Sequence, residues 1–180
     1  RSPGLKFLSL AEDGAMIDDV TTEELARLGH DSSDPGLLLT LTAGGNDLLD
    51  ALATGRKLDK VVKRIEQRFT YLVEMIREEL PRATLVLTTV YDPTDGTGNL
   101  PGMEGYGSLP LEYLDEFNDY VREMADSMTR TVVADVHRHF VGHGVTALDR
   151  DRWYWRRNMI EPNARGASEI RRVWLEALAL

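Results

Sequence analysis

The hydrophobic residues of this chain fall into two patterns, short runs of strand length and longer segments with helical spacing. Uninterrupted apolar or β-branched runs cover residues 37–41 and 84–90, and shorter, mostly apolar stretches cover residues 5–11 and 131–136. Continuous runs of this kind are typical of strands that are buried on both faces of a parallel sheet. Because these strands alternate with helical segments, we expect an α/β fold: a doubly wound, flavodoxin-like parallel sheet with helices on both faces, in three α/β/α layers.

Five segments have the periodicity of amphipathic helices. The clearest runs from Lys57 to Leu80, where nine apolar residues recur at helical spacing before Pro81 ends the pattern. The other helices are expected over residues 22–29, 46–53, 114–128 and 164–178. A loop rich in glycine and proline, residues 91–110, follows the strand at 84–90. A loop of this length is often a lid or a binding loop.

The turn after residues 37–41 carries the strongest functional signal. Gly44-Gly45-Asn46-Asp47 follow the buried run and open a short helical segment. In an open α/β sheet, the turn from a strand into the next helix lies at the edge where ligands bind. The glycines allow a positive φ and a close approach of the backbone to a ligand, and the Asn46 amide can point into the crevice. A plain tight turn, with Asn46 as the helix cap, explains the same residues.

Three segments together resemble the SGNH (GDSL-like) esterase/lipase family. They are residues 8–20, which contain Asp13-Gly14, then the Gly-Gly-Asn-Asp turn, and then residues 160–167 ahead of the last helix. Their order and separations match the family over nearly the whole chain, from Leu5 to Leu180. The resemblance implies hydrolysis of an acyl or acetyl ester through a serine nucleophile. It also implies that the Gly14 N–H and the Asn46 side chain form the oxyanion hole, together with the N–H of the nucleophile.

The chain departs from this family at the nucleophile. The family carries its serine in a Gly-Asp-Ser motif after the first strand, ahead of the segment that matches residues 5–11, and the chain has no such segment. Five serines are candidate substitutes, and they lie inside a predicted strand, a polar or glycine-rich loop, or a helix; none of these positions is a strand-to-helix elbow. They are Ser9, Ser32, Ser33, Ser108 and Ser168.

The resemblance places the missing strand in the middle of the sheet, in the order 2-1-3-4-5. Its absence would leave backbone N–H and C=O groups of two strands without partners. We therefore expect residues 5–11 to pair directly with residues 37–41, or a strand to come from an upstream segment or from another copy in a homo-oligomer.

A second departure lies just before the last helix. The family reads Asp-x-x-His there, and this chain has Asn158 and Glu161 in the matching places. An ordinary glutamate has a pKa of about 4.3, so it is a weaker base than histidine at neutral pH unless burial raises that pKa. We expect Glu161 near the crevice, either as the catalytic base or bound to backbone N–H groups at the start of the last helix.

Histidines after residues 131–136 offer a substitute base. His137, His139 and His143 follow this strand and fall on the predicted ligand edge. His143 lies between two glycines and is the best placed to act as a neutral imidazole base in the crevice. Hydrogen-bonded loop histidines are the plain alternative. If the segment is extended, alternate residues share a face, so the three histidines could instead bind a metal ion.

Composition narrows the range of partners. A chain of 180 residues with 42% hydrophobic content suits one domain, residues 1–180, here an SGNH-like domain without its first strand and nucleophile turn. A net charge of −9 argues against a nucleic-acid partner, because phosphate contacts need clustered Lys and Arg. The arginines at 150–157 are interleaved with aspartates and aromatics, which favours a solvated loop. The chain has no cysteine and no apolar run of membrane-spanning length.

Three hypotheses for function follow. The first is an ester hydrolase that acts on a small-molecule ester without a cofactor, with a serine supplied from outside these residues. The second is a non-catalytic relative that binds a ligand in the same pocket. The third is a metal-dependent hydrolase centred on His137, His139 and His143. The opening residues 1–4 are neither a signal peptide nor an initiator methionine, so we expect the chain to begin inside a longer, cytoplasmic protein.

Overall fold

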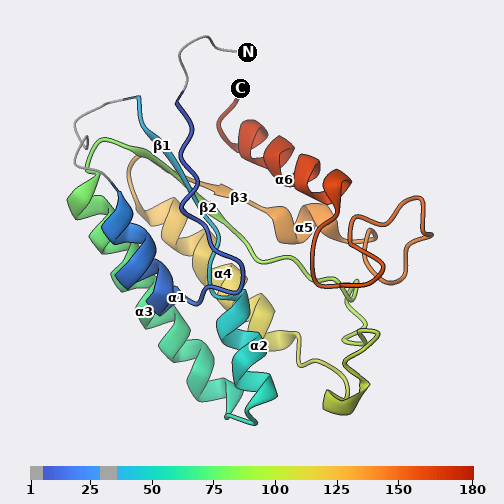
Figure 1. Cartoon of the computed structure of the whole chain (residues 1–180). Helices are drawn as coiled ribbons and strands as arrows, with labels where there is room; N and C mark the ends of the chain where they lie inside the picture. The colour runs from blue at the N-terminus through green and yellow to red at the C-terminus, as the bar shows by residue number, and fades with distance from the viewer. Residues whose placement is uncertain (1–5, 29–35) are drawn as a thin grey trace.

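Three parallel strands form the sheet of this protein, whose computed structural model describes residues 6–28 and 36–180. Their order is β1 (Leu38–Leu41), β2 (Thr84–Thr88) and β3 (Thr131–Ala134) (Figure 1). Leu39 pairs with Leu85, which in turn pairs with Thr131. Parallel neighbours need crossover connections, and these are α2 (Gly45–Ala53) with α3 (Leu58–Glu79), and α4 (Glu112–Ser127). The strands predicted near residues 37–41, 84–90 and 131–136 are confirmed.

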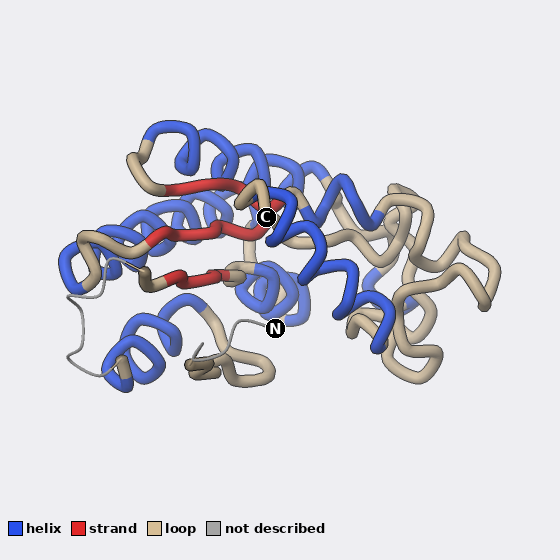
Figure 2. Tube along the Cα trace, turned by 90° about the horizontal axis from the view of Figure 1, so that it is seen from above, coloured by secondary structure: helices blue, strands red, loops and turns tan. Residues whose placement is uncertain are grey.

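Helices cover both faces of the sheet, so the predicted three-layer α/β/α arrangement is confirmed. Figure 2 shows the three strands side by side with helices around them. On one face, α1 (Ile17–Asp19), α3 and α4 enclose a core in which Phe69 and Phe117 meet edge to face. On the other face, α5 (Val136–Phe140) and α6 (Ala164–Ala177) enclose a second core. β2 contributes side chains to both cores, because successive residues of a strand point to opposite faces: Leu85 and Leu87 lie in the first core and Val86 lies in the second.

Four of the five predicted helices lie close to their expected bounds. α2, α3, α4 and α6 are confirmed. The helix expected at 22–29 instead begins at Ile17, because the Asp19 carboxylate accepts a hydrogen bond from the Met16 N–H at 2.9 Å. It continues as a π-helix, η1 (Val20–Glu24), and a 3-10 turn, η2 (Leu25–Arg27). A short 3-10 turn, η3 (Glu104–Tyr106), lies in the long loop. No helix in the described ranges is long and apolar enough to cross a membrane.

The strand expected at residues 5–11 is not formed by its described part. Residues 6–11 have no regular structure and are mostly exposed, and they do not pair with β1. The expected direct pairing of residues 5–11 with residues 37–41 is therefore wrong. β1 is paired only on its β2 side within the described residues, and Leu38 is 45% exposed. Apolar side chains alone do not make a strand, because its backbone groups also need hydrogen-bonded partners, and residues 6–11 pair with none of the three strands in the described part of the chain.

Candidate active site

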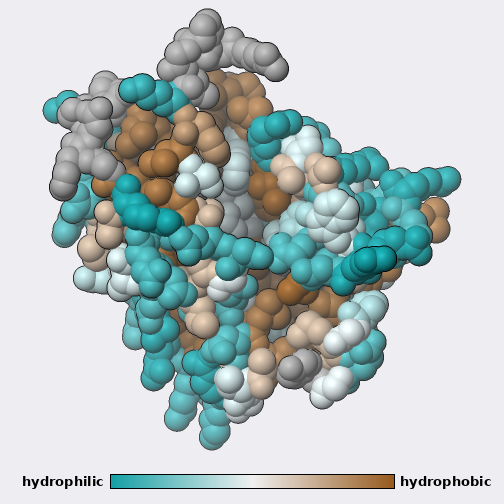
Figure 3. Space-filling model, in the orientation of Figure 1, coloured by the Kyte–Doolittle hydropathy of each residue, from teal (hydrophilic) through white to brown (hydrophobic). Residues whose placement is uncertain are grey.

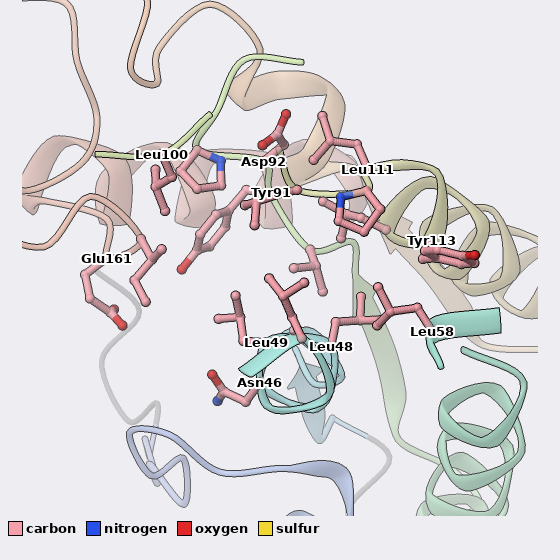
Figure 4. Close-up of a pocket in the computed structure, with 18 residues that line it drawn as sticks. Asn46, Leu48, Leu49, Leu58, Tyr91, Asp92, Leu100, Leu111, Tyr113 and Glu161 are labelled. Atoms are coloured by element: carbon pink, nitrogen blue, oxygen red, sulfur yellow. The ribbon is translucent and has the colours of Figure 1, made fainter. Parts of the chain in front are cut away.

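The carboxyl ends of β1 and β2 lead to an apolar pocket of about 160 Å³ (Figure 4). Most of its wall is aliphatic and comes from α2, from the loop after β2 and from the start of α4. The main apolar residues are Leu48, Leu49, Leu52, Leu58, Val90, Leu100, Leu109, Leu111, Leu114 and Ile160. Asn46, Tyr91 and Glu161 add polar groups at one side. A cavity therefore lies at the carboxyl edge of the sheet, where the sequence predicted that ligands bind.

The paired glycines allow β1 to turn tightly into α2 beneath α4. Gly44 has φ +101°, and a Cβ there would lie 2.5 Å from the ring of Phe117. At Gly45 a Cβ would lie 3.1 Å from a methyl group of Val90. A side chain at Gly44 would be strained by the backbone and blocked by the aromatic ring. The turn thus brings Asn46, in the first turn of α2, to the end of β1.

Asn46 and Asp47 hold residues 14–17 against this turn. The Asn46 Nδ2 donates to the Ala15 carbonyl at 2.9 Å, and the Asp47 carboxylate accepts from the Ile17 N–H at 3.1 Å. Gly14, with φ +80°, therefore lies next to a residue that Asn46 contacts. An asparagine amide has two N–H groups, so one remains for a ligand. Asn46 lines the cavity and Gly14 is not among its lining residues, and their shared role as oxyanion donors stays a prediction.

Asp47 supports the turn from inside the protein. Its side chain is buried, and burial raises the pKa of this carboxyl, although the Ile17 N–H and Arg68, 3.9 Å away, act in the opposite direction. Since its carboxylate already accepts the Ile17 N–H, we assign Asp47 a positioning role for residues 14–17.

Tyr91 is a polar group at the pocket that the sequence reasoning did not single out. Its ring stacks on Phe140, with centroids 5.5 Å apart, and meets Tyr154 edge to face. Burial raises the pKa of the Tyr91 hydroxyl, and the charges of Glu161 and Asp13 raise it further, so the group stays a protonated donor. Its position as the residue directly beyond the buried run at 84–90 was the available signal.

Asn118 fixes the backbone that carries Tyr91. This fully buried side chain accepts from the Val90 N–H at 2.7 Å and donates to the Val90 carbonyl at 2.8 Å. The amide replaces a neighbouring strand at the point where β2 ends. The segment after β2 is therefore held in place from α4, together with the pocket wall that it forms.

Glu161 lies at the pocket and Asn158 does not. The Glu161 side chain lines the cavity, while Asn158 is exposed and lines a separate groove. Burial raises the pKa of the Glu161 carboxyl, and the charge of Asp13 raises it further. Figure 4 shows the Glu161 carboxyl, the Tyr91 hydroxyl and the Asn46 amide on the same side of the pocket. With its raised pKa and its place at the pocket, Glu161 is better suited to accept a proton than a glutamate on the open surface would be.

The alternative role expected for Glu161, at the start of the last helix, is wrong. Asn163 is the N-cap of α6, and its Oδ1 accepts from the N–H groups of Arg165 and Gly166 at 2.9 and 3.1 Å. Asparagine is among the preferred N-cap residues because its side chain reaches these N–H groups without strain. The carboxyl of Glu161 is left facing the pocket.

The three histidines do not converge. β3 ends at Ala134 and Asp135 caps α5, so the segment is helical and alternate residues do not share a face. His137 lies 3.6 Å from Asp115, and His139 bonds Glu169 at 2.9 Å. No group of three His, Asp or Glu side chains suited to a metal ion occurs in residues 6–28 and 36–180. The prediction of an extended segment whose three histidines bind a metal ion is therefore wrong.

His143 is held outside the pocket wall. Its ring stacks on Trp153 with centroids 3.5 Å apart, and its Nδ1 lies 2.9 Å from the Asp151 carbonyl. It is not among the residues that line the cavity. Of the two candidate bases, the structure brings Glu161 and not His143 to the side of Asn46.

Comparisons with known proteins agree with this arrangement. The profile of the GDSL-like Lipase/Acylhydrolase family matches residues 8–168. No curated protein matches the chain. Among solved structures, the extracellular lipase of Streptomyces rimosus superposes with a TM-score of 0.67 and 19% identity over 91% of this chain and 77% of that one. Phospholipase A1 of Streptomyces albidoflavus NA297 superposes with a TM-score of 0.62 and 20% identity, over 91% of this chain and 77% of that one.

A third solved structure has the same fold. It is a protein of Parabacteroides merdae ATCC 43184 described as a GDSL-like lipase, with a TM-score of 0.65 and 20% identity over 92% of this chain and 69% of that one. At such identities the superpositions establish the fold, whereas the family profile establishes kinship along most of the chain.

Proposed function

This chain belongs to the GDSL-like lipase/acylhydrolase family, and we propose that it hydrolyses esters with a short aliphatic acyl chain. The observation that carries the proposal is the aliphatic pocket beside Asn46. In an acyl hydrolase, the carbonyl oxygen must meet the oxyanion donors while the acyl chain lies in an adjoining apolar space. Asn46 lines the pocket itself, so a carbonyl bound to its amide would direct its chain between Leu48 and Leu49.

The size of the pocket limits the acyl chain. A cavity of about 150 Å³ holds one benzene molecule, and this pocket has about 160 Å³. An acyl group of about four to six carbons therefore fits better than a long fatty-acyl chain. The lipases and the phospholipase A1 to which the fold is similar also act on esters.

We assign the roles of the groups around the carbonyl as follows. A serine Oγ attacks the ester carbon, and the oxyanion that forms accepts hydrogen bonds from the Gly14 N–H and the Asn46 amide. Glu161 takes the proton of the serine and returns it to the departing alcohol, with the Tyr91 hydroxyl as a further donor. Water then repeats the attack on the acyl-enzyme and releases the acid.

The serine itself is proposed to reach the site on a strand that pairs with the open edge of β1. That edge ends beside Gly44 and Asn46, so a strand along it would deliver its following turn next to both oxyanion donors. The strand comes from an upstream segment or from a second copy, and the second case makes the active species a homo-oligomer. A non-catalytic ligand-binding protein would use the same pocket but would not be labelled by a fluorophosphonate on such a serine.

Acyl-chain preference tests the pocket assignment. We expect kcat/KM for p-nitrophenyl hexanoate to exceed that for the acetate by about tenfold or more, because each buried CH₂ contributes about 0.8 kcal/mol, and to fall for the dodecanoate. Leu49→Phe, which fills the cavity, should reverse the order of hexanoate and acetate. Leu175→Phe, at an exposed site on α6, is the matched control. Equal rates for all three esters in the parent protein would contradict the assignment.

A further inference from the structure

The lobe formed by residues 141–158 differs in charge from the rest of the molecule and projects beyond α5 (Figure 1). It contains four arginines and two aspartates, a formal charge of +2 in a chain whose total is −9. Three of its apolar side chains are exposed: Val141 (60%), Leu148 (63%) and Trp155 (56%). Figure 3 shows the projection as largely hydrophilic with a hydrophobic spot at its outer end. The lobe thus carries both cationic and exposed apolar side chains.

The backbone of the lobe is fixed by two charged side chains. The Asp95 carboxylate accepts hydrogen bonds from the N–H groups of Gly142, Gly144 and Thr146, at 2.9 to 3.0 Å, and from the Thr146 hydroxyl at 2.6 Å. The Arg152 guanidinium donates to three backbone carbonyls between residues 144 and 147. These bonds hold the backbone of residues 142–147, next to the exposed Leu148, and the Trp155 N–H donates to the Glu161 carbonyl at 2.9 Å.

Arginines line a wide groove of about 710 Å³ at the base of this lobe. They are Arg152, Arg156, Arg157 and Arg165, and Trp155 borders the same groove. Asp149 pairs with Arg152 at 3.1 Å and with Arg156 at 3.2 Å, so one carboxylate serves two guanidinium groups. Arg157 forms no ion pair with any residue in the described ranges. The groove therefore has excess positive charge next to an exposed aromatic ring.

We propose that this lobe docks the protein onto an anionic lipid surface. Trp155 and Leu148 enter the interfacial layer, and the arginines of the groove bind lipid phosphates. Tryptophan favours the boundary between headgroups and acyl chains because its ring is apolar and its N–H is polar. Arginine binds phosphate oxygens in a bidentate manner. A soluble polyanion would satisfy the arginines but would leave Leu148 and Trp155 in water, so the lipid surface fits both features of the lobe.

Binding to vesicles tests this proposal without any measurement of ester hydrolysis, so its failure is separate from failure of the proposed function. We expect the full-length protein to co-sediment with vesicles that contain one third phosphatidylglycerol, and not with pure phosphatidylcholine vesicles. Trp155→Ala should lower the partition coefficient about tenfold, as expected for withdrawing one buried side chain. Arg156→Gln with Arg157→Gln should lower it by about tenfold or more. Binding should weaken as salt is added.

A matched control removes an exposed aromatic ring elsewhere. Tyr71 on α3 is 58% exposed and lies outside the lobe, so Tyr71→Ala should leave vesicle binding unchanged. Thermal unfolding of each variant shows that the fold is retained. Equal vesicle binding by Trp155→Ala and the parent would overturn the proposal. So would equally tight binding to dextran sulfate that does not depend on Trp155, which would indicate a general polyanion site.

Discussion

Replacing Asn46 with alanine should lower kcat by about 10²-fold or more, the usual effect of losing one preorganised oxyanion donor. The reason is geometric. Gly44 and Gly45 turn β1 into α2 so tightly that the Asn46 amide reaches the pocket, where it also holds the Ala15 carbonyl at 2.9 Å. Hydrolysis of p-nitrophenyl hexanoate by the full-length protein measures the loss.

The same substitution also removes the bond to Ala15, so a displaced turn must be told apart from a lost donor. Asp47→Ala is the matched variant, because Asp47 anchors the same turn through the Ile17 N–H without reaching the ester. We expect this variant to unfold at a lower temperature, since the buried N–H of Ile17 loses its acceptor, but to lose far less activity. If Asp47→Ala costs as much turnover as Asn46→Ala, Asn46 is a positioning residue and the oxyanion assignment is wrong.

Glu161→Gln should lower kcat/KM by about 10²-fold to 10⁴-fold, which is the range for loss of a general base. Glutamine keeps the size of the side chain but cannot accept the proton. His143→Ala is the competing variant, and we expect a small effect there because the His143 ring stacks on Trp153 outside the pocket wall. The reverse result, in which His143→Ala abolishes activity and Glu161→Gln does not, would make His143 the base.

The pH dependence gives an independent check on this base. Burial and then the charge of Asp13 raise the pKa of Glu161. A base must be deprotonated to act, so activity should rise with pH through a midpoint above the ordinary glutamate value. Asp13→Asn removes one of the two causes and should move that midpoint to lower pH. No such shift is expected if a histidine is the base.

The parts of the fold that the sequence predicted are those whose signal is local. In α3, the apolar positions recur over six turns, and residues such as Phe69 and Leu72 are fully buried as that pattern requires. The strand predicted at residues 5–11 is not formed by its described part, residues 6–11, because strand formation depends on pairing that no local pattern reveals. α5 was missed because Val136 was counted with the strand, whereas the Asp135 side chain accepts the Arg138 N–H and starts a helix there.

A site residue could be predicted from the sequence when a local turn positions it, but not when contacts with distant parts of the chain position it. The turn at Gly44 and Gly45 needs glycine, so Asn46 could be placed from the sequence alone. Glu161 was expected near the crevice from the sequence, but only the structure shows that Asn163, and not Glu161, caps α6. Tyr91 owes its position to Asn118, which bonds both backbone groups of Val90. These contacts join residues far apart in the chain, and nothing in the sequence near Tyr91 indicates them.

In the function proposed above, these residues form the oxyanion and acyl-binding part of a serine esterase whose nucleophile arrives on a strand along β1. The most direct measurement compares residues 1–180 with the same chain joined to an upstream segment that carries Gly-Asp-Ser. Fluorophosphonate labelling and hydrolysis of p-nitrophenyl hexanoate are followed in both. We predict labelling at the added serine and hydrolysis that disappears when this serine becomes alanine, with neither in residues 1–180 alone. Serine-dependent hydrolysis by residues 1–180 alone would show that the nucleophile does not arrive on an added strand.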